Sequence, residues 1–365
     1  MKNVILIIGE AIRYNPPFFS YILREYEQVF GVIDDIKFIN ENDKNLPFLI
    51  EKMVSKYDYI TIFATKVAYA IAGKILSTLT LDTLELKDCG TLAPSAAKFV
   101  VKDSFLLDIK GCLVNVLKAD PLQKLPQILQ DPLNEGEGFY LFDTDYASAK
   151  ARLESLALSY KISFIISEYS SFLLFVRASE QKFGALDKFL DSVSKYYANS
   201  FIASKNFISH AVEKLREIGA KITFAESCTA GLLAAKFGEI AGVSDIFDGS
   251  VVSYANEIKR AWLDVSDEVL QNYGAVSEQC VAGMLGGALE SSGANFALAI
   301  SGIAGPGGGS DEKPVGTVFI GAKELGGRQI IGKFHLNGDR NYIREEAANI
   351  AVCLLLKLRS DLFLN

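Results

Sequence analysis

The chain has 365 residues, and at about 150 residues per domain this length suggests two or three domains. Half of the residues are hydrophobic and 22% are charged, a composition that excludes a disordered chain and a disulfide-stapled miniprotein. The net charge of −7 gives no general attraction to nucleic acid or anionic lipid, and a total of two histidines excludes a histidine-rich metal site.

The first part of the chain alternates between buried strands and helices. The opening apolar run Val4–Ile8 is rich in β-branched residues, as buried parallel strands are. The pattern continues as helix, strand, helix and strand over Phe18–Phe30, Ile36–Ile39, Pro47–Lys56 and Tyr59–Phe63. This order predicts an α/β domain.

Shorter strands follow this alternating region. They are predicted at Phe99–Val101, Ser104–Ile109 and Cys112–Leu117. The segment Asn134–Gly138, with the sequence NEGEG, has the composition of a linker. The first domain is therefore predicted to comprise residues 1–137.

Residues 138–202 are predicted to form a small α+β module. Its expected elements are a helix, the two strands of a hairpin and an amphipathic helix, at Ser148–Leu156, Ser163–Ile166, Phe172–Arg177 and Gln181–Tyr197. The hairpin is expected to turn at Glu168–Ser171. Such a module is too short to suggest an enzyme by itself.

Residues 203–365 are predicted to form a third, α/β domain. Its expected helices are Ile208–Ile218, Leu232–Glu239, Asn256–Leu263, Val276–Leu289 and Asn341–Leu358. Its expected strands are Lys221–Phe224, Gly249–Tyr254, Asn295–Ser301, Thr317–Ala322 and Gln329–His335.

The cysteines point to a reducing compartment. They are Cys89, Cys112, Cys228, Cys280 and Cys353, and no two of them form a C-x-x-C pair. The first apolar run is too short for a secretory signal, and no run reaches the roughly 18–20 residues of a membrane span. We therefore expect a cytoplasmic protein.

The turn Ala225–Gly231, with the sequence AESCTAG, offers a candidate nucleophile. Ser227 lies where a strand meets a helix, and backbone N–H groups and the helix dipole at such a place can hold an oxyanion. On spacing alone, capping of the helix is the better explanation for this serine. Cys228 is either a rival nucleophile or a small buried residue.

A serine nucleophile needs a base, and the candidates are His335 and Lys259. His335 has no recognisable acidic partner. Asn256 is expected to cap the next helix, which places Lys259 at its third position, where the helix dipole disfavours the ammonium by about 0.3–1 kcal/mol. Burial, together with a second cation or a tyrosine nearby, would have to supply the rest of a pKa shift towards neutrality, and the alternative is an ordinary surface lysine.

A glycine-rich loop follows a predicted strand at Ser301–Ser310, with the sequence SGIAGPGGGS. It lacks the lysine of a Walker loop, and a strand follows it, so it is not a dinucleotide fingerprint either. Its amides could approach a phosphate or a substrate, or the loop could be a flexible connection. Arg340, just before the last helix, is a candidate phosphate ligand or a surface residue.

Together these segments resemble the C-terminal domain of CinA (competence/damage-inducible) proteins, which is known as a nicotinamide mononucleotide (NMN) deamidase. The segments that carry the resemblance are AESCTAG at Ala225–Gly231, YANEIK at Tyr254–Lys259, GAVS at Gly274–Ser277, SGIAGP at Ser301–Pro306, KPVGTV at Lys313–Val318 and GDR at Gly338–Arg340. Ala230 departs from the pattern, because the family usually has a second glycine there.

The resemblance implies that NMN is hydrolysed to nicotinate mononucleotide and ammonia, in pyridine nucleotide recycling, by a serine amidohydrolase that uses no metal or other cofactor. It assigns Ser227 as the nucleophile, Lys259 as the general base and Tyr254 as an assisting hydroxyl.

The resemblance also implies which residues bind the substrate. They are Cys228, Thr229, Asn256, Ser301, Gly302, Ala304, Gly305 and Arg340. The amides near Cys228 and Thr229 would form the oxyanion hole, and Arg340 would meet the phosphate.

The N-terminal domain resembles, less closely, the three-layer molybdopterin-binding-like α/β domain of fused CinA proteins. Where the family has the sequences GDEL, GGLGPT and PGxP, this chain has GEAI at Gly9–Ile12, FATKVA at Phe63–Ala68 and KADP at Lys118–Pro121. The glycines that would approach a phosphate and the acids that would hold a metal are missing, so we expect this domain to be inactive. Residues 138–202 stand where the family has a KH-like module, without the GxxG clamp for RNA.

Two other functions stay open at this stage. One is ADP-ribose pyrophosphatase activity of the N-terminal domain, and the other is a non-enzymatic, nucleotide-binding role related to competence or damage. We expect NMN as the small-molecule partner and neither nucleic acid nor membrane. The resemblance implies a homo-oligomer, either a dimer or a larger assembly.

Overall fold

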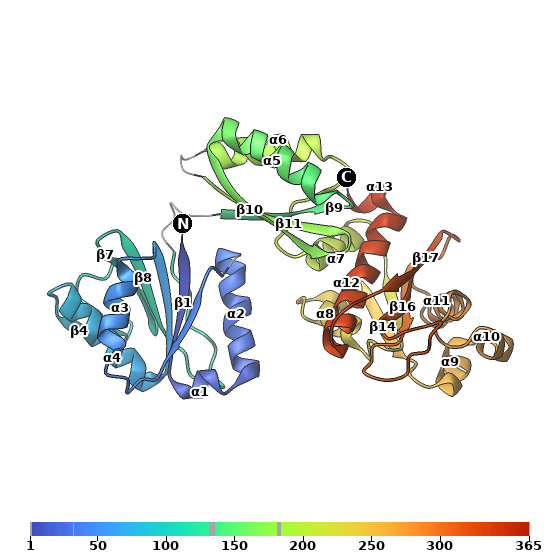
Figure 1. The fold of residues 1–365 in the computed structure, drawn as a ribbon, viewed down its shortest axis with the longest axis horizontal. Helices are drawn as coiled ribbons and strands as arrows, with labels where there is room; N and C mark the ends of the chain where they lie inside the picture. The colour runs from blue at the N-terminus through green and yellow to red at the C-terminus, as the bar shows by residue number, and fades with distance from the viewer. Residues whose placement is uncertain (1, 32, 131–135, 181–183, 365) are drawn as a thin grey trace. The chain divides into compact units, whose positions relative to one another are not determined.

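The computed structural model describes residues 2–31, 33–130, 136–180 and 184–364. It divides into two compact units, Met1–Glu137 and Gly138–Asn365, whose elements are labelled in Figure 1. Both units are of the mixed α/β class expected from the sequence.

The first unit is built on a six-stranded sheet in the order β2-β1-β3-β8-β7-β6. Its strands are β1 (Asn3–Ile8), β2 (Ile36–Ile39), β3 (Tyr59–Ala64), β6 (Phe99–Val101), β7 (Ser104–Ile109) and β8 (Cys112–Lys118). The first three and β8 run parallel, and β7 and β6 are antiparallel additions. The separate pair β4 (Leu84–Leu86) and β5 (Leu92–Pro94) was not expected.

Helices cover both faces of this sheet, which makes the unit three-layered. The helices are α1 (Glu10–Arg13), α2 (Pro16–Phe30), α3 (Leu46–Val54) and α4 (Lys66–Leu79). Val4 and Leu6 of β1 pack with residues of α3 and α4, whereas Ile5 and Ile7 pack with residues of α2. Alternate side chains of β1 therefore belong to two hydrophobic cores, one on each face of the sheet, as the continuous apolar run predicted.

The second unit begins with a four-stranded sheet in the order β10-β11-β9-β12. Its elements are β9 (Gly136–Phe142), α5 (Tyr146–Tyr160), β10 (Ile162–Ser170), β11 (Leu173–Glu180), α6 (Ala185–Tyr196) and β12 (Phe201–Ile202). Two expectations were wrong here. Gly136–Gly138 starts a strand instead of a linker, and Glu168 lies in β10 instead of the hairpin turn, because the hairpin ladder extends further than its apolar residues. Residues 134–135 of the expected linker and residues 181–183 of the expected helix lie outside the described chain.

A five-stranded sheet in the order β14-β13-β15-β16-β17 forms the rest of the second unit. Its strands are β13 (Ile222–Glu226), β14 (Phe247–Val252), β15 (Phe296–Gly302), β16 (Thr317–Glu324) and β17 (Gln329–His335). The first three are parallel and the last two antiparallel. The segments that follow β13, β14 and β15 therefore meet at one edge of the sheet, the usual place for a ligand in such folds.

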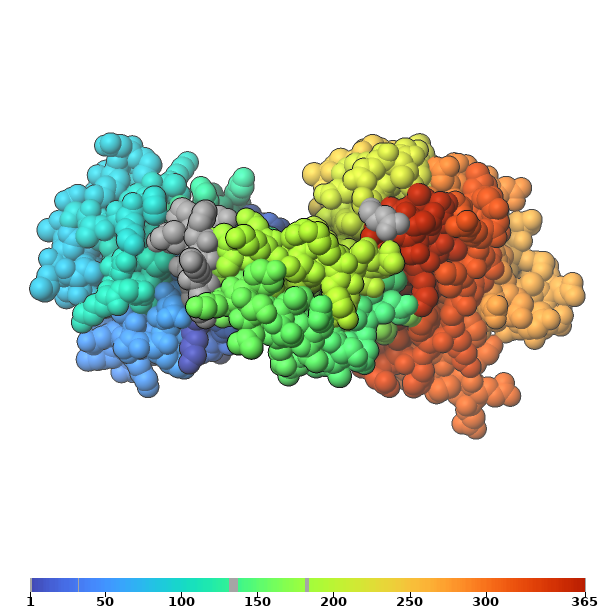
Figure 2. Space-filling model, turned by 90° about the horizontal axis from the view of Figure 1, so that it is seen from above, coloured from blue at the N-terminus to red at the C-terminus, as the bar shows by residue number. Residues whose placement is uncertain are grey.

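Two layers of helices enclose this sheet. The helices are α7 (Phe207–Glu217), α8 (Leu232–Gly238), α9 (Asn256–Leu263), α10 (Asp267–Asn272), α11 (Glu278–Ser292), α12 (Arg340–Leu358) and α13 (Ser360–Phe363). Residues of α7, α8 and α12 share the larger core, and residues of α11 share a second core with the other face of the sheet. In Figure 2 the yellow-orange residues of this region, which include α10, lie on the surface of the second unit, in keeping with the lack of buried residues in α10.

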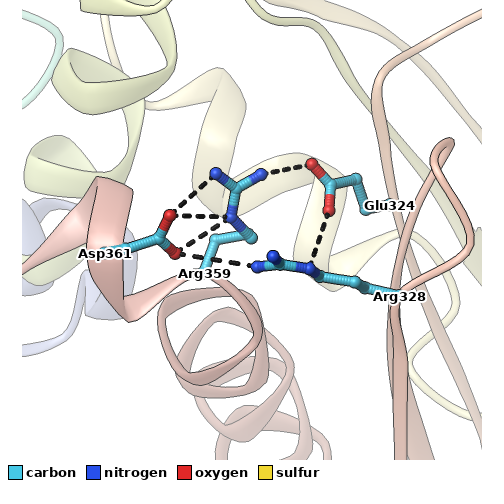
Figure 3. A network of polar contacts seen from close by, with 4 residues as sticks. All are labelled: Glu324, Arg328, Arg359 and Asp361. Atoms are coloured by element: carbon cyan, nitrogen blue, oxygen red, sulfur yellow. Dashed lines mark hydrogen bonds and ion pairs between the residues drawn. The ribbon is translucent and has the colours of Figure 1, made fainter.

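Polar contacts fix α12 near its C-terminal end (Figure 3). Arg359 pairs with Asp361 at 2.8 Å and also contacts Glu324 of β16. These two carboxylates hold the pKa of the Arg359 guanidinium above its ordinary value. Arg328 adds longer contacts of 4.0 Å to Glu324 and 3.9 Å to Asp361.

Further contacts join α12 to the four-stranded sheet. Glu346 accepts hydrogen bonds from the Ser170 hydroxyl and from the Ser171 amide and hydroxyl, each at 2.9 Å. Lys357 pairs with Asp143 at 2.8 Å. Over the part of the chain that is described, no helix has the length and apolar character needed to cross a bilayer.

Candidate active site

A serine and a lysine meet at the edge of the five-stranded sheet. Ser227 follows β13, and Lys259 lies in α9, which follows β14. The Lys259 Nζ atom lies 3.1 Å from the Ser227 Oγ atom, which is hydrogen-bond distance. The parallel pairing of β13 with β14 explains the contact, because it sets Glu226 opposite Val252 and so brings the two following segments together.

Lys259 is a buried amine without a carboxylate partner among the described residues. Only 1% of this residue is exposed, and its Nζ donates to the carbonyl oxygens of Ser253 at 2.6 Å and Tyr254 at 3.3 Å. Burial lowers the pKa of Lys259 below its ordinary value, since the ammonium loses hydration. The surface-lysine alternative is therefore excluded.

The expected position of Lys259 within its helix was wrong by one residue. Ala255, not Asn256, is the N-cap residue of α9, because Ala255 has extended backbone angles and accepts the Lys259 amide. Asn256 is the first helical residue, and its exposed side chain forms no hydrogen bond with a described residue. Lys259 thus lies one position deeper in the helix than the sequence suggested.

The turn after β13 is held by a buried carboxylate that the sequence analysis missed. Glu226 is fully buried and accepts the amides of Gly231, Leu233 and Ala234 at 3.0, 3.1 and 3.0 Å. It also accepts the Ser250 hydroxyl at 3.0 Å. This carboxylate therefore occupies the N-terminus of α8. The sequence had suggested instead that the N–H groups of this terminus are open to a ligand.

Ser227 is not the N-cap of α8. That position belongs to Gly231, which has a φ of 89°. The capping explanation for the serine is therefore wrong, and its hydroxyl faces Lys259 instead.

Two amides of the turn donate to no other described residue. The amides of Ser227, Ala230 and Leu232 donate to main-chain oxygens, and those of Gly231, Leu233 and Ala234 to Glu226. Among the described residues, the amides of Cys228 and Thr229 donate to no other residue. Such free amides beside a nucleophile can stabilise an oxyanion.

Cys228 is a poor rival to the serine. Burial raises the pKa of its thiol to about 11, so the thiol is protonated at neutral pH and lacks the reactive thiolate. His335, the other candidate base, is exposed at the end of β17. It lines an open cleft of about 500 Å³ together with the β10–β11 hairpin, and no hydrogen bond joins it to Ser227 in the described chain.

Arg340 brings the tyrosine and the glycine-rich loop together. Its guanidinium donates to the Tyr254 hydroxyl at 2.7 Å and to the Gly305 carbonyl at 2.6 Å. The Tyr254 hydroxyl thus contacts Arg340, whereas its main-chain oxygen contacts Lys259.

The glycine-rich loop begins in close contact with its neighbours. Ser301 is buried and donates to the Ala275 carbonyl at 2.7 Å, and Ala304 is also buried. A Cβ atom at Gly302 would lie 2.9 Å from the Thr317 carbonyl oxygen, so only glycine fits there.

Arg344 is a further residue that the sequence analysis missed. Its Nε and Nη2 atoms donate to the Thr229 carbonyl at 3.2 and 2.8 Å. The available signal was its spacing of four residues from Arg340 on one helix, which places both side chains on one face.

In the first unit, the carboxylates near the carboxyl ends of the parallel strands accept hydrogen bonds from nearby groups. Glu10 accepts from Asn40 at 2.8 Å, and Glu41 accepts from Thr65 at 2.8 Å. Asp120 accepts the amide at the start of α4 at 3.1 Å. Across the described ranges, no three or more His, Cys, Asp or Glu side chains group in a way that could hold a metal ion.

Comparison with known proteins identifies the C-terminal region. The sequence model of the CinA C-terminal domain matches residues 204–359. A CinA-like protein of Fervidobacterium nodosum is 48% identical over 134 residues, which are 37% of this chain and 33% of the relative. A CinA-like protein of Thermotoga neapolitana is 34% identical over 261 residues, or 68% of this chain and 63% of the relative. The aligned part thus spans less than two thirds of these CinA-like relatives.

A shorter relative is covered almost whole. The nicotinamide-nucleotide amidohydrolase PncC of Enterobacter agglomerans is 48% identical over 134 residues, which are 37% of this chain and 82% of that protein. The crystal structure of the competence/damage inducible protein CihA from Agrobacterium tumefaciens is 40% identical, with a TM-score of 0.41, and covers 42% of this chain and 93% of that one. The match to the family model and the sequence similarity to these relatives show that the chain belongs to the CinA family.

Proposed function

We propose that this protein is an amidohydrolase that converts NMN to nicotinate mononucleotide and ammonia. The observation that carries the proposal is the 3.1 Å contact between the Ser227 hydroxyl and the buried amine of Lys259. The name of the PncC relative supports the substrate.

The chemistry follows from a buried lysine beside a serine, because burial lowers the pKa of the Lys259 amine. The Ser227 oxygen attacks the carboxamide carbon of NMN while its proton passes to the Lys259 amine. The negative oxygen of the tetrahedral intermediate accepts the amides of Cys228 and Thr229. Lys259 then gives its proton to the leaving nitrogen, which departs as ammonia, and a water activated by Lys259 releases nicotinate mononucleotide from the serine ester.

The remaining predicted residues line the substrate site in this proposal. Arg340 binds the phosphate, for which its exposed guanidinium is suited. Tyr254 links Arg340 to the lysine through its hydroxyl and its main-chain oxygen. The loop that contains Ser301, Gly302, Ala304 and Gly305 forms a wall of the pocket, and Asn256 lies at its rim.

We assign this activity to residues 203–365 and regard residues 138–202 as a KH-like module and residues 1–137 as an inactive molybdopterin-binding-like domain. We further propose that the protein is cytoplasmic and acts as a homo-oligomer. The reaction itself draws only on side chains and amides of the second unit.

An ammonia-release assay with purified protein and NMN tests the proposal. The wild type should form one nicotinate mononucleotide for each ammonia, and Ser227→Ala should reduce the rate to background. Ser291→Ala, an exposed serine of α11 remote from the pair in sequence, is the matched control and should keep full activity. Wild-type turnover in Ser227→Ala would overturn the proposal.

A further inference from the structure

The turn that carries the free amides is conformationally costly. Ala230 has a φ of 51° and Gly231 a φ of 89°, so two consecutive residues are left-handed. For a residue with a Cβ atom this conformation is disfavoured, because Cβ comes too close to the following carbonyl oxygen. The chain must therefore hold this turn through other contacts.

Glu226 contacts only the C-terminal part of the turn, where α8 begins. Its carboxylate accepts the amides from Gly231 onward, which belong to the start of α8. The preceding peptides, which contain the Cys228 and Thr229 amides, form no hydrogen bond with this carboxylate. Their position must be fixed from the other side of the turn.

Arg344 supplies that contact. Two nitrogens of its planar guanidinium donate to the single carbonyl of Thr229, and a third lies 3.3 Å from the Asn341 side chain. The Leu232 amide donates to the same carbonyl at 3.2 Å. This carbonyl belongs to the peptide that directly follows the one carrying the Thr229 amide, so Arg344 and Leu232 together hold the C-terminal side of Thr229.

We propose that Arg344 is a positioning residue for the oxyanion hole. Its two hydrogen bonds to the Thr229 carbonyl keep the Cys228 and Thr229 amides directed away from internal acceptors and available to the substrate. The inference rests on the proposed amide hydrolysis. It separates the roles of the two arginines on this face of α12, with Arg340 at the substrate and Arg344 on the turn.

This role requires a guanidinium and not only a positive charge. A lysine at residue 344 would keep the charge but would offer a single ammonium in place of the fork that matches the carbonyl from two nitrogens. A residue that bound the substrate phosphate would behave differently, because its loss would weaken substrate binding first.

The test compares Arg344→Lys with the wild type in NMN turnover. We expect kcat to fall about tenfold to a hundredfold, less than the 10²–10³ loss on removing an oxyanion donor itself, with KM changed by less than about twofold. Arg216→Lys is the matched control, since Arg216 pairs with Asp245 on the surface of the same unit, and it should keep wild-type kcat and KM. Addition of guanidinium ion at millimolar concentration should restore part of kcat to Arg344→Ala and none to Ser227→Ala.

The outcomes separate this inference from the proposed function. A raised KM with unchanged kcat in Arg344→Lys, or unchanged kinetics, would overturn the positioning role while NMN hydrolysis stands. If the wild type releases no ammonia from NMN, the proposed function fails, and the rate at which a fluorophosphonate labels Ser227 still tests Arg344. This rate should fall in Arg344→Lys but not in Arg216→Lys, and equal rates in all three proteins would overturn the inference.

Discussion

At the scale of single residues, the proposed base leads to an expected pH dependence of activity. In the proposed mechanism Lys259 accepts a proton from Ser227 only in its neutral form, and burial lowers its pKa below the ordinary value. We expect kcat/KM to rise with pH through this lowered pKa and to level off above it.

Lys259→Arg provides the check. A guanidinium stays protonated at accessible pH, so this variant should be inactive throughout and show no rising limb. A pH–rate profile of the wild type that rises only near the pKa of an unperturbed lysine would contradict the assignment.

The same pKa shift has a consequence for stability. Because the pKa of Lys259 is lower in the folded protein, the unfolded chain binds a proton more readily between the two pKa values. The contribution of Lys259 to stability therefore decreases as pH falls from the unfolded pKa towards the folded one, and becomes constant below it. The neutral form of Lys259, which the proposed mechanism needs, therefore predominates at the same high pH at which burial of Lys259 destabilises the fold least.

Glu226 should matter for stability through the four donors that it accepts. Glu226→Gln replaces one accepting oxygen with an NH₂ group that faces N–H or O–H donors. We expect a loss of about 2 kcal/mol or more in the free energy of unfolding, because buried donors lose their partners. Urea denaturation measures it, with Glu239→Gln at the exposed end of α8 as the control. Equal midpoints for the two variants would contradict the role of the buried carboxylate.

At the scale of elements, α12 carries both arginines of the site, and its far end is fixed by the ion pairs of Arg359. Arg359→Met removes the contacts to Asp361 and Glu324 at once. We expect a loss of about 1 kcal/mol in stability, smaller at high salt, because these charges are partly exposed. Arg328→Met removes only the contacts of 4.0 and 3.9 Å and should lower the melting temperature less. Equal melting temperatures for Arg359→Met and the wild type would contradict this.

The elements themselves were largely predictable from sequence. β2, β6, β7, α9 and β17 match the expected ranges, since apolar runs and helical spacing mark them clearly. α4 and α10 were missed, and the start of β9 was taken for a linker because Gly136–Gly138 has the composition of a turn.

The site was predictable only in part. Ser227 and Lys259 were singled out from the sequence, but their contact depends on the pairing of β13 with β14, which no local pattern specifies. The burial of Lys259 likewise results from packing between elements distant in sequence. The roles of Glu226 and Arg344 were not predicted, because both residues contact backbone groups. In a sequence, charged residues with such partners cannot be distinguished from ordinary surface residues.

At the scale of the whole molecule, the two units are expected to differ in activity. The carboxylates at the sheet edge of the first unit, Glu10, Glu41 and Asp120, each already accept a local donor. We predict that the full chain carrying Ser227→Ala forms no AMP from ADP-ribose in the presence of Mg²⁺. Metal-dependent AMP formation by this variant, followed by chromatography, would instead establish a pyrophosphatase in the first unit.

The filling of the α8 N-terminus by Glu226 bears on how the site senses ionic strength. A phosphate bound to helix amides in a dry pocket would be little affected by dissolved salt. Here that position already holds a carboxylate, so in the proposed reaction the phosphate of NMN is attracted by exposed guanidinium groups such as that of Arg340, whose field counter-ions screen within about 10 Å at 0.1 M salt. We therefore expect substrate binding to depend on ionic strength, and the proposed proton transfer between Ser227 and the buried amine of Lys259 to depend on it much less.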